Sequence, residues 1–224
     1  MKIEHVAPGV IRVAVSPFDT VNVYLIDDVL VDSGGRLVGK RLLSILSGRI
    51  IRSHVLTHGH FDHQGSSHYI CEHLGIPLRC GEGDRHAVES GNQAELLSNP
   101  RGYLAWLVQR LAGPPHQVSR SLKEGDVIGS FQVLETPGHT PGHLAFWRET
   151  DRILIIGDIL FHRNPVTFRP GLSEPFRFAT FDIAVNRNSA RRLAALNPTL
   201  ICFGHGEPLH NGERFREFVS TLPH

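Results

Sequence analysis

Residues 57–63 read THGHFDH, which places three histidines and one aspartate within seven consecutive positions. His58 and His60 are two residues apart, so their side chains point the same way if an extended strand runs through them. Asp62 and His63 follow, where we expect the chain to turn into a helix. Neutral imidazoles and a carboxylate at a strand end suit Zn²⁺, Mn²⁺ or Fe²⁺. The spacing therefore indicates a metal site, against the alternative of ordinary surface-loop histidines.

Three more residues of ligand type occur downstream, each after an apolar stretch or a tight glycine turn. They are His139 in ETPGHTPGH, Asp158 in LIIGDIL and His205 in ICFGHG. Open α/β folds place their active sites at the ends of strands, where loops bring distant residues together. We therefore expect these three side chains to join the first cluster.

The elements that must position these residues alternate between strands and helices. We expect strands at 10–15, 21–27, 29–35, 50–58, 152–160 and 199–206, two strands within 129–147, and helices at 36–48, 64–75, 181–196 and 212–220. Near-continuous Val, Ile and Leu runs are typical of buried strands, and Gly48 and Gly75 are suitable helix C-caps. The pattern predicts a layered α/β fold with helices covering a sheet core.

Two segments do not fit this scaffold. Residues 83–116 carry helical patterns between strand-like stretches, and we expect either a lid over the site or a plain packing insertion. Residues 161–178 read as an irregular loop rich in Arg, Pro and Phe, which suits a substrate loop. Arg163, Arg169 and Arg177 in that loop could meet an anionic substrate, although a solvated loop is the more common setting for such arginines.

The composition and charge of the chain indicate which classes of binding partner to expect. The 224 residues are 41% hydrophobic and 20% charged with a net charge of +1, as in an ordinary globular protein. Charges of both signs are interspersed, so we expect a small-molecule substrate and no nucleic-acid or membrane partner. The start of the chain lacks the layout of a secretory signal and the three cysteines form no disulfide framework, so we expect a cytoplasmic protein.

Taken together, these motifs resemble a known family. His58-x-His60-x-Asp62-His63 followed by Gly138-His139, Gly157-Asp158 and Gly204-His205 is similar to the pattern of the metallo-β-lactamase-fold hydrolases, and especially to the glyoxalase II-like branch in a short form without the C-terminal helical domain. The resemblance covers nearly the whole chain. It implies one domain over residues 1–224 with a four-layer αββα sandwich, in which two mixed β-sheets are covered by helices.

The resemblance also implies two metal sites. His58, His60 and His139 would hold one ion, Asp62, His63 and His205 the other, and Asp158 would bridge them. Two divalent ions about 3.5–4 Å apart repel each other, and a shared carboxylate offsets that repulsion. Zinc is the expected metal, with iron or manganese as alternatives. Asp62 would in addition be catalytic, because it could orient the attacking hydroxide or carry its proton.

Other polar residues have simpler expected roles. Asp32, in LVDSGG, is a candidate hydrogen-bond partner for a ligand histidine, or a residue that stabilises its own turn. We expect His143 to be structural, His54 to pack in or beside its strand, and Cys202 to belong to the core.

Departures from the family pattern limit the reactions that we expect this protein to catalyse. Asp158 and His63 stand where β-lactamases with a cysteine ligand carry Cys and Arg, and Phe161 stands where acyl-homoserine lactonases tend to carry Tyr. The Gly-Cys-Gly-Arg run that usually follows in glyoxalase II is absent. We therefore expect a dinuclear-metal hydrolase that cleaves a small thioester, ester or lactone.

Several alternatives stay open. They are a mononuclear-iron sulfur dioxygenase that uses His58, His139 and Asp158, an acyl-homoserine lactonase, a weak β-lactamase, and a metal-binding module without catalysis.

Overall fold

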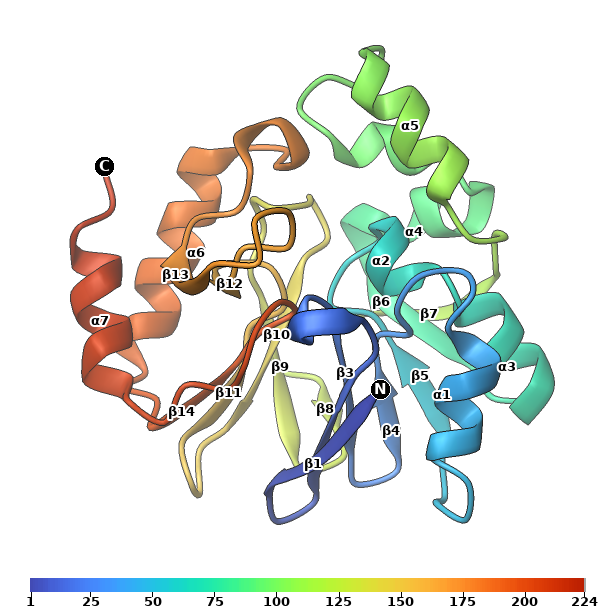
Figure 1. Cartoon of the computed structure of the whole chain (residues 1–224), viewed down its shortest axis with the longest axis horizontal. Coiled ribbons are helices and arrows are strands. Elements are labelled where there is room, and N and C mark those ends of the chain that lie inside the picture. The colour runs from blue at the N-terminus through green and yellow to red at the C-terminus, as the bar shows by residue number, and fades with distance from the viewer. Residues whose placement is uncertain (224) are drawn as a thin grey trace.

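The computed structural model describes residues 1–223 and contains two mixed β-sheets packed face to face (Figure 1). The first sheet has the order β1 (Lys2–Ala7), β2 (Val10–Ala14), β3 (Asn22–Ile26), β4 (Val29–Val31), β5 (Ser53–Val55), β6 (Leu78–Gly81), β7 (Val118–Leu122). The second has the order β14 (Leu200–Cys202), β11 (Ile153–Ile155), β10 (Leu144–Arg148), β9 (Phe131–Glu135), β8 (Val127–Ile128). Strands β1 to β4 pair antiparallel and β4 to β7 parallel, while in the second sheet only β11 and β14 are parallel.

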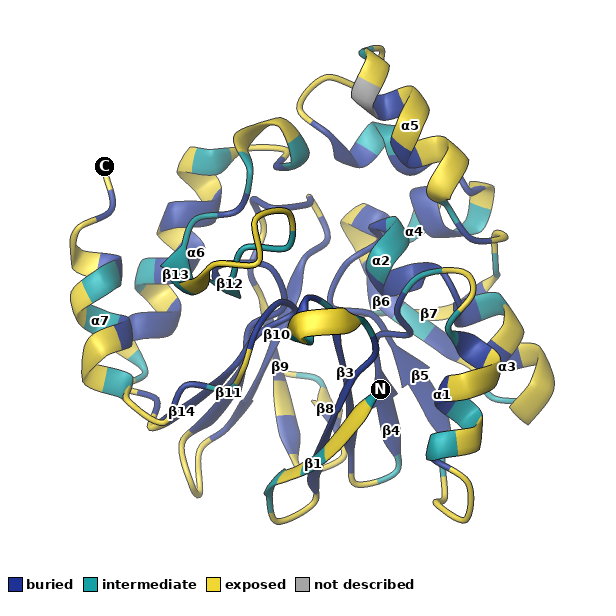
Figure 2. Cartoon of the chain, viewed as in Figure 1, coloured by how far each residue is buried: buried dark blue, intermediate teal, exposed yellow. Residues whose placement is uncertain are grey.

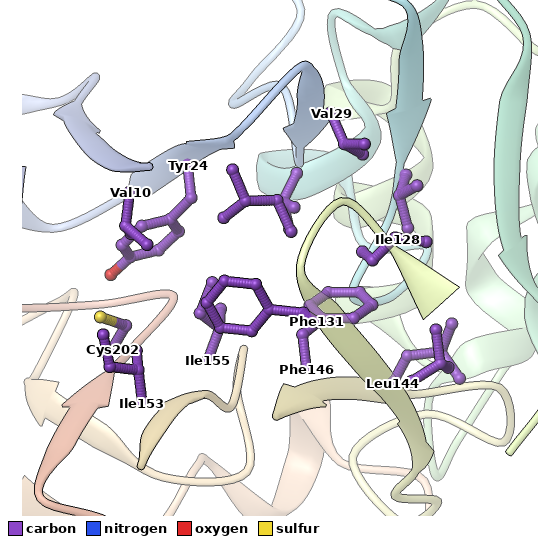
Figure 3. Packing of buried hydrophobic residues seen from close by; sticks show 14 of the residues in the cluster. Val10, Tyr24, Val29, Ile128, Phe131, Leu144, Phe146, Ile153, Ile155 and Cys202 are labelled. Carbon is purple, nitrogen blue, oxygen red and sulfur yellow. The ribbon is translucent and has the colours of Figure 1, made fainter. Parts of the chain in front are cut away.

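Alternation along the strands builds the core between the sheets. Tyr24 and Ile26 of β3 face the second sheet, where they pack with Phe131, Phe146 and Ile155. Figure 3 shows Tyr24 beside these three side chains. The residues between them in sequence face outward, toward the helices. Because both faces of the central strands are covered, nearly every position in them is apolar, as the Val, Ile and Leu runs predict.

Helices cover the outer face of each sheet. Helices α1 (Gly39–Ile45) and α3 (Ser67–Leu74) pack on the first sheet, joined beside β6 by α4 (Glu82–Ser90), whereas α6 (Ile183–Ala195) and α7 (Gly212–Ser220) pack on the second. Figure 2 shows the central strands buried and the outer faces of these helices exposed. The expected αββα sandwich is therefore confirmed. Over residues 1–223, no helix is both long and apolar enough to cross a membrane.

Local chemistry explains where the elements end. Asp182 accepts hydrogen bonds from the amides of Ala184 and Val185 and so begins α6, and Asn211 does the same for Arg214 in α7. Gly75 ends α3 in the left-handed conformation, with φ of 64°. By contrast, α1 ends at Ile45, so the expectation of a helix over 36–48 capped by Gly48 is wrong at both ends.

The strand expected over 50–58 is also shorter than the sequence indicates. β5 ends at Val55. The amide of Leu56 still donates to the carbonyl of Arg79 on β6, but Thr57 N donates to Asp32 Oδ1 over 2.8 Å and Gly59 N to Asp84 Oδ2 over 2.8 Å, so the chain leaves the sheet there. The helix expected over 64–75 is α3, which begins three residues later at Ser67, and a separate short helix, α2 (Phe61–Gln64), precedes it. His58 and His60 therefore lie on a loop, not on an extended strand.

The two additional segments are both ordered. Residues 83–116 contain most of α4, a 3-10 helix (Gln93–Leu96) and α5 (Tyr103–Leu111), which lies beyond the ends of the strands in Figure 1. Residues 161–178 are not an irregular loop. They form a hairpin of β12 (Phe161–Arg163) and β13 (Pro170–Ser173), because Asn164 Oδ1 accepts the amides of Val166 and Thr167 and fixes the turn. Further 3-10 helices are Arg177–Ala179 and Pro17–Asp19.

Candidate metal centre

The seven side chains singled out by the sequence meet at one end of the sandwich, between the edges of the two sheets. His58, His60, Asp62 and His63 follow β5, His139 lies on the turn between β9 and β10, Asp158 follows β11, and His205 follows β14. Six of them are buried and Asp62 is half-buried. The positions span about two thirds of the sequence, so only the fold brings them together.

The first group consists of His58, His60 and His139. His60 Nδ1 lies 3.0 Å from His139 Nε2, and one ring nitrogen from each of the three lies within 4.8 Å of the others. Two imidazole nitrogens bound to one tetrahedral zinc ion are about 3.3 Å apart, given Zn–N bonds of about 2.0–2.1 Å. This group therefore has the spacing of three ligands to one ion.

The second group consists of Asp62, His63 and His205. Asp62 Oδ2 lies 3.6 Å from His205 Nε2 and 4.0 Å from His63 Nε2. The three side chains offer one donor atom each within 4.8 Å, which again suits one ion.

Asp158 lies between the two groups. Its Oδ2 is 2.9 Å from His205 Nε2 and 3.6 Å from His139 Nε2, while its Oδ1 is 3.4 Å from His63 Nε2. Gly204 permits this packing, because a Cβ at that position would overlap Asp158 Oδ1 and His63 Cε1. One carboxylate thus faces members of both groups, as a bridging ligand must.

Unpaired buried atoms provide a test of whether metal ions fit here. Among the described residues, Nε2 of His58 and His63 and Oδ1 of Asp158 are buried without a hydrogen-bond partner. Each such atom costs about 1–3 kcal/mol unless something binds it. Imidazole nitrogens and carboxylate oxygens are suitable donors for divalent ions, so two ions of this kind fit the side chains present.

The electrostatics differ between the two groups. Burial lowers the pKa of His58 and His139 well below the usual value, and that of His60 to about 4, so these rings are neutral and ready to donate a lone pair. Burial alone would also lower the pKa of His63 and His205, but the nearby carboxylates, Asp158 first, outweigh it and raise both.

For the carboxyl of Asp158, burial and the neighbouring charges shift the pKa in opposite directions. Burial would raise the pKa of its carboxyl, but His205 and His63 outweigh burial and lower it well below its ordinary value. Asp158 is therefore an anion, as a metal-bridging carboxylate requires.

Hydrogen bonds orient the histidine rings. Asp32 Oδ2 accepts from His63 Nδ1 over 2.9 Å and from the Thr57 hydroxyl over 2.8 Å, so Asp32 both orients a candidate ligand and stabilises the adjacent turn. The Thr180 hydroxyl lies 3.2 Å from His139 Nδ1, and the backbone carbonyl of Thr20 accepts from His205 Nδ1.

Three further residues have the structural settings that the sequence indicates. The amide of Asp158 donates to His143 Nε2 over 3.1 Å, so His143 supports the backbone at Asp158. His54 is fully buried beside Leu30 and Ser67, and Cys202 lies in the core between the sheets, where burial raises its thiol pKa to about 12.

Asp84, on α4, is a supporting residue that the sequence motifs do not reveal. Its carboxylate accepts from Gly59 N, from the Thr140 hydroxyl and from Gly142 N over 2.7–2.8 Å. It thereby ties the loop that carries His58 and His60 to the turn that carries His139. The only indication in the sequence is a carboxylate shortly after β6, and that signal is weak because the strand is short and includes an arginine.

The turn at 203–206 is held by residues from the start of the chain. Asn22 Nδ2 and the Tyr24 hydroxyl donate to the carbonyl of Phe203, and the buried guanidinium of Arg12 donates to that of Gly206. This set of contacts, which we call the N-terminal clamp (Arg12, Asn22 and Tyr24), fixes the position of His205. It was not expected from the sequence.

A cavity of about 350 Å³ opens beside the seven side chains. Five of them line it, together with apolar residues of the insertion and the hairpin segment. Arg163, Arg169 and Arg177 are not among its lining residues: Arg163 donates to the carbonyl of Phe168, and the other two are exposed. The suggestion that these arginines meet an anionic substrate gains no support from their positions.

Comparison with known proteins agrees with this architecture. The probable metallo-hydrolase YflN of Bacillus subtilis is 28% identical over 214 residues, which cover 88% of this chain and 80% of YflN. The hydroxyacylglutathione hydrolase GloC of Haemophilus influenzae is 30% identical over 140 residues, or 59% of this chain and 60% of GloC. The crystal structure of TTHA1623 in a di-iron-bound form superimposes with a TM-score of 0.69 at 30% identity, covering 89% of this chain and 93% of that one. A family profile described as the Metallo-beta-lactamase superfamily matches residues 16–205. The chain therefore belongs to the metallo-β-lactamase superfamily.

Proposed function

We propose that this protein is a dinuclear-metal hydrolase that cleaves a thioester, ester or lactone of a small molecule. The observation that supports it best is the position of Asp158 between two groups of three ligand-type side chains. A single-metal site has no use for the second group. Related proteins described as a metallo-hydrolase and as a hydroxyacylglutathione hydrolase are in keeping with hydrolysis of this kind.

Two divalent ions bound here would supply an activated water at neutral pH and a Lewis acid for the carbonyl of the substrate. Asp62 belongs to the second group and lines the cavity, and its side chain is 24% exposed against 4% for Asp158. It can accept a proton from the attacking water and pass it to the departing group. Among the described residues that line the cavity there is no serine or cysteine, so a covalent nucleophile of either type is not part of this proposal.

Phe161 bears on the choice of substrate. Its ring packs edge-on against His205 at 4.7 Å between centroids and forms part of the cavity wall. A phenyl ring cannot donate a hydrogen bond to a lactone oxygen, whereas a tyrosine there could. Open-chain esters and thioesters are therefore preferred over lactones in this proposal.

Metal analysis combined with a substrate panel tests the proposal. We expect about two ions per chain, and turnover of phenyl esters and thioesters that falls to the uncatalysed rate in His58→Ala and Asp158→Ala. His210→Ala, which changes an exposed histidine remote from the centre, should keep full turnover. Normal turnover in a verified metal-free sample would exclude the proposal.

The same sample distinguishes the sulfur dioxygenase alternative. One iron per chain, together with oxygen uptake in the presence of a persulfide and no ester hydrolysis, would support that alternative. Metal identity is a separate outcome, because His and Asp sites accept zinc, iron or manganese according to supply.

A further inference from the structure

We propose that the cavity beside the seven side chains is an acyl-binding pocket that takes an apolar, uncharged acyl group of the substrate. This inference rests on the proposed hydrolase function and specifies the substrate class for that site. It follows from what lines the cavity, from where the charged groups point, and from the apolar surface exposed at its rim.

The walls come from the two segments added to the sandwich. The insertion contributes Leu97 and Val108, and the segment after Asp158 contributes Phe161, Val166 and Phe178. These side chains carry no hydrogen-bonding group, so they can recognise only apolar surface. The volume of about 350 Å³ lies at the small end of the range for ligand pockets, about 300–1000 Å³, which suits one short chain or ring.

The ligand-type side chains that line the cavity belong to one cluster, the metal centre, and Thr20 is the other polar residue of the wall. His60, Asp62, His139, Asp158 and His205 line the same cavity, and no lysine or arginine does so within the described part of the chain. A carbonyl placed against these five residues would have its apolar substituent directed along the remaining, apolar wall. A carboxylate on that substituent would be removed from water without a cationic partner, which is unfavourable.

The exposed apolar residues at the rim of the cavity also favour an apolar acyl group. Val166 is 66% exposed and Phe178 54% exposed, although both are apolar and line the cavity. An acyl chain that enters between them removes this surface from water. Each buried methylene contributes about 0.8 kcal/mol, which corresponds to a three- to fourfold gain in binding.

The first experiment measures kcat/KM of the metal-loaded enzyme for phenyl esters of acetate, butyrate, hexanoate and octanoate. We expect a rise of about three- to fourfold per methylene that levels off when the pocket is filled. A succinyl ester, which has the same number of carbons as the butyryl ester but ends in a carboxylate, should be hydrolysed at least about tenfold less efficiently than the butyryl ester.

Two variants test the location of the pocket. Val166→Glu places a carboxylate at the rim and should flatten the chain-length series. Val127→Glu is the matched control, because Val127 is also 66% exposed but lies on β8, outside the pocket, and it should keep the wild-type series. Val108→Phe fills the pocket and should shorten the longest chain accepted.

The outcomes separate this inference from the proposed function. Absence of hydrolysis for the whole series, for the corresponding thioesters and for lactones in a two-metal sample would overturn the proposed function. Hydrolysis with equal efficiency for acetyl and octanoyl esters, or a succinyl ester as good as the butyryl ester, would overturn the acyl pocket and leave the hydrolase standing. A flat series in Val127→Glu as well as in Val166→Glu would also count against the pocket.

Discussion

A single carboxylate, Asp84, orders two of the loops that form the centre. Asn in its place keeps the size but loses one acceptor oxygen, so at least one buried donor is left unpaired. We expect Asp84→Asn to lower the free energy of unfolding by about 1–3 kcal/mol and to reduce the metal content of the purified protein. Urea unfolding and elemental analysis measure the two effects.

Asp126→Asn is the control for that change, because Asp126 accepts a backbone hydrogen bond from Lys123 in an exposed turn. We expect it to shift stability by no more than about 0.5 kcal/mol. Wild-type stability and metal content in Asp84→Asn would show that the three hydrogen bonds are dispensable.

His54 should make stability depend on pH. Leu30 O accepts from its Nδ1, so Nε2 is the acceptor for the Ser67 hydroxyl and the buried ring is neutral. Burial lowers its pKa from 6.5 to about 4. The folded state therefore binds fewer protons than the unfolded state between these values, and stability present above pH 6.5 is lost as the pH falls toward 4.

The expected contribution of His54 is about 3 kcal/mol across that window. Denaturant unfolding at several pH values should give a shallower loss for His54→Gln than for wild type, while His210→Gln should match wild type. Identical pH dependence in His54→Gln and wild type would contradict the assignment.

At the residue scale, the candidate metal ligands are easier to recognise from the sequence than the residues that hold their loops in place. His58, His60, Asp62 and His63 are recognisable because four ligand-type residues within six positions are rare without chemistry. The role of Asp84 depends on three donors from other segments, and no spacing along the chain encodes such contacts.

At the scale of elements, glutamine side chains attach α5 to the rest of the insertion. Gln109 Oε1 accepts from Gln93 N over 3.1 Å and Gln109 Nε2 donates to the carbonyl of Gly91 over 2.6 Å. Gln93 in turn donates to Gln64 on α2, next to His63. The wall that α5 contributes to the cavity is therefore linked to the metal centre.

Gln109→Ala should loosen α5 without weakening the helix itself, because Ala is the best helix former. Two lost hydrogen bonds of about 1 kcal/mol each predict amide exchange roughly ten- to thirtyfold faster in residues 103–111. Hydrogen-exchange mass spectrometry measures this, and Arg101→Ala, at an exposed position just before α5, should leave exchange unchanged. Unchanged exchange in Gln109→Ala would mean that packing alone holds α5.

Elements were predictable where their signals are local. Helices α6 and α7 lie within two residues of their expected bounds, and Asp182 and Asn211 cap them from the adjoining sequence. Strand β7 was missed because it carries exposed polar residues in its middle. The hairpin at 161–178 was missed because one side chain, Asn164, organises its turn.

At the scale of the whole molecule, the candidate ligands come from both sheets. His58, His60 and His63 follow the first sheet, whereas Asp158 and His205 follow the second. Ions bound between these side chains would link the two sheets of the sandwich. Because the unfolded chain does not bring these residues together, the ions would bind the folded state far more tightly. The layered fold was predictable from the order of strands and helices together with the motif resemblance. The packing of the two sheets depends on contacts distant in sequence, which the sequence alone does not disclose.

Removal of metal should therefore lower the thermal unfolding midpoint. At a free metal concentration about a thousandfold above the dissociation constant, one bound ion adds about 4 kcal/mol of stability. Calorimetry on metal-loaded and chelator-treated protein should show a clear decrease in wild type and His210→Ala, and a smaller one in His58→Ala. Equal midpoints with and without verified metal would show that the site does not link the two sheets.

The N-terminal clamp has a consequence for how the protein is made on the ribosome. Arg12 and Asn22 are fully buried in the finished molecule, yet their carbonyl partners lie 181–194 residues further along the chain. During translation the first strands emerge long before those partners exist, and their polar groups must stay hydrated until then. The first strands therefore cannot complete their contacts until residues 203–206 have been synthesised. His205 reaches its place in the same late event that shields Arg12 from water.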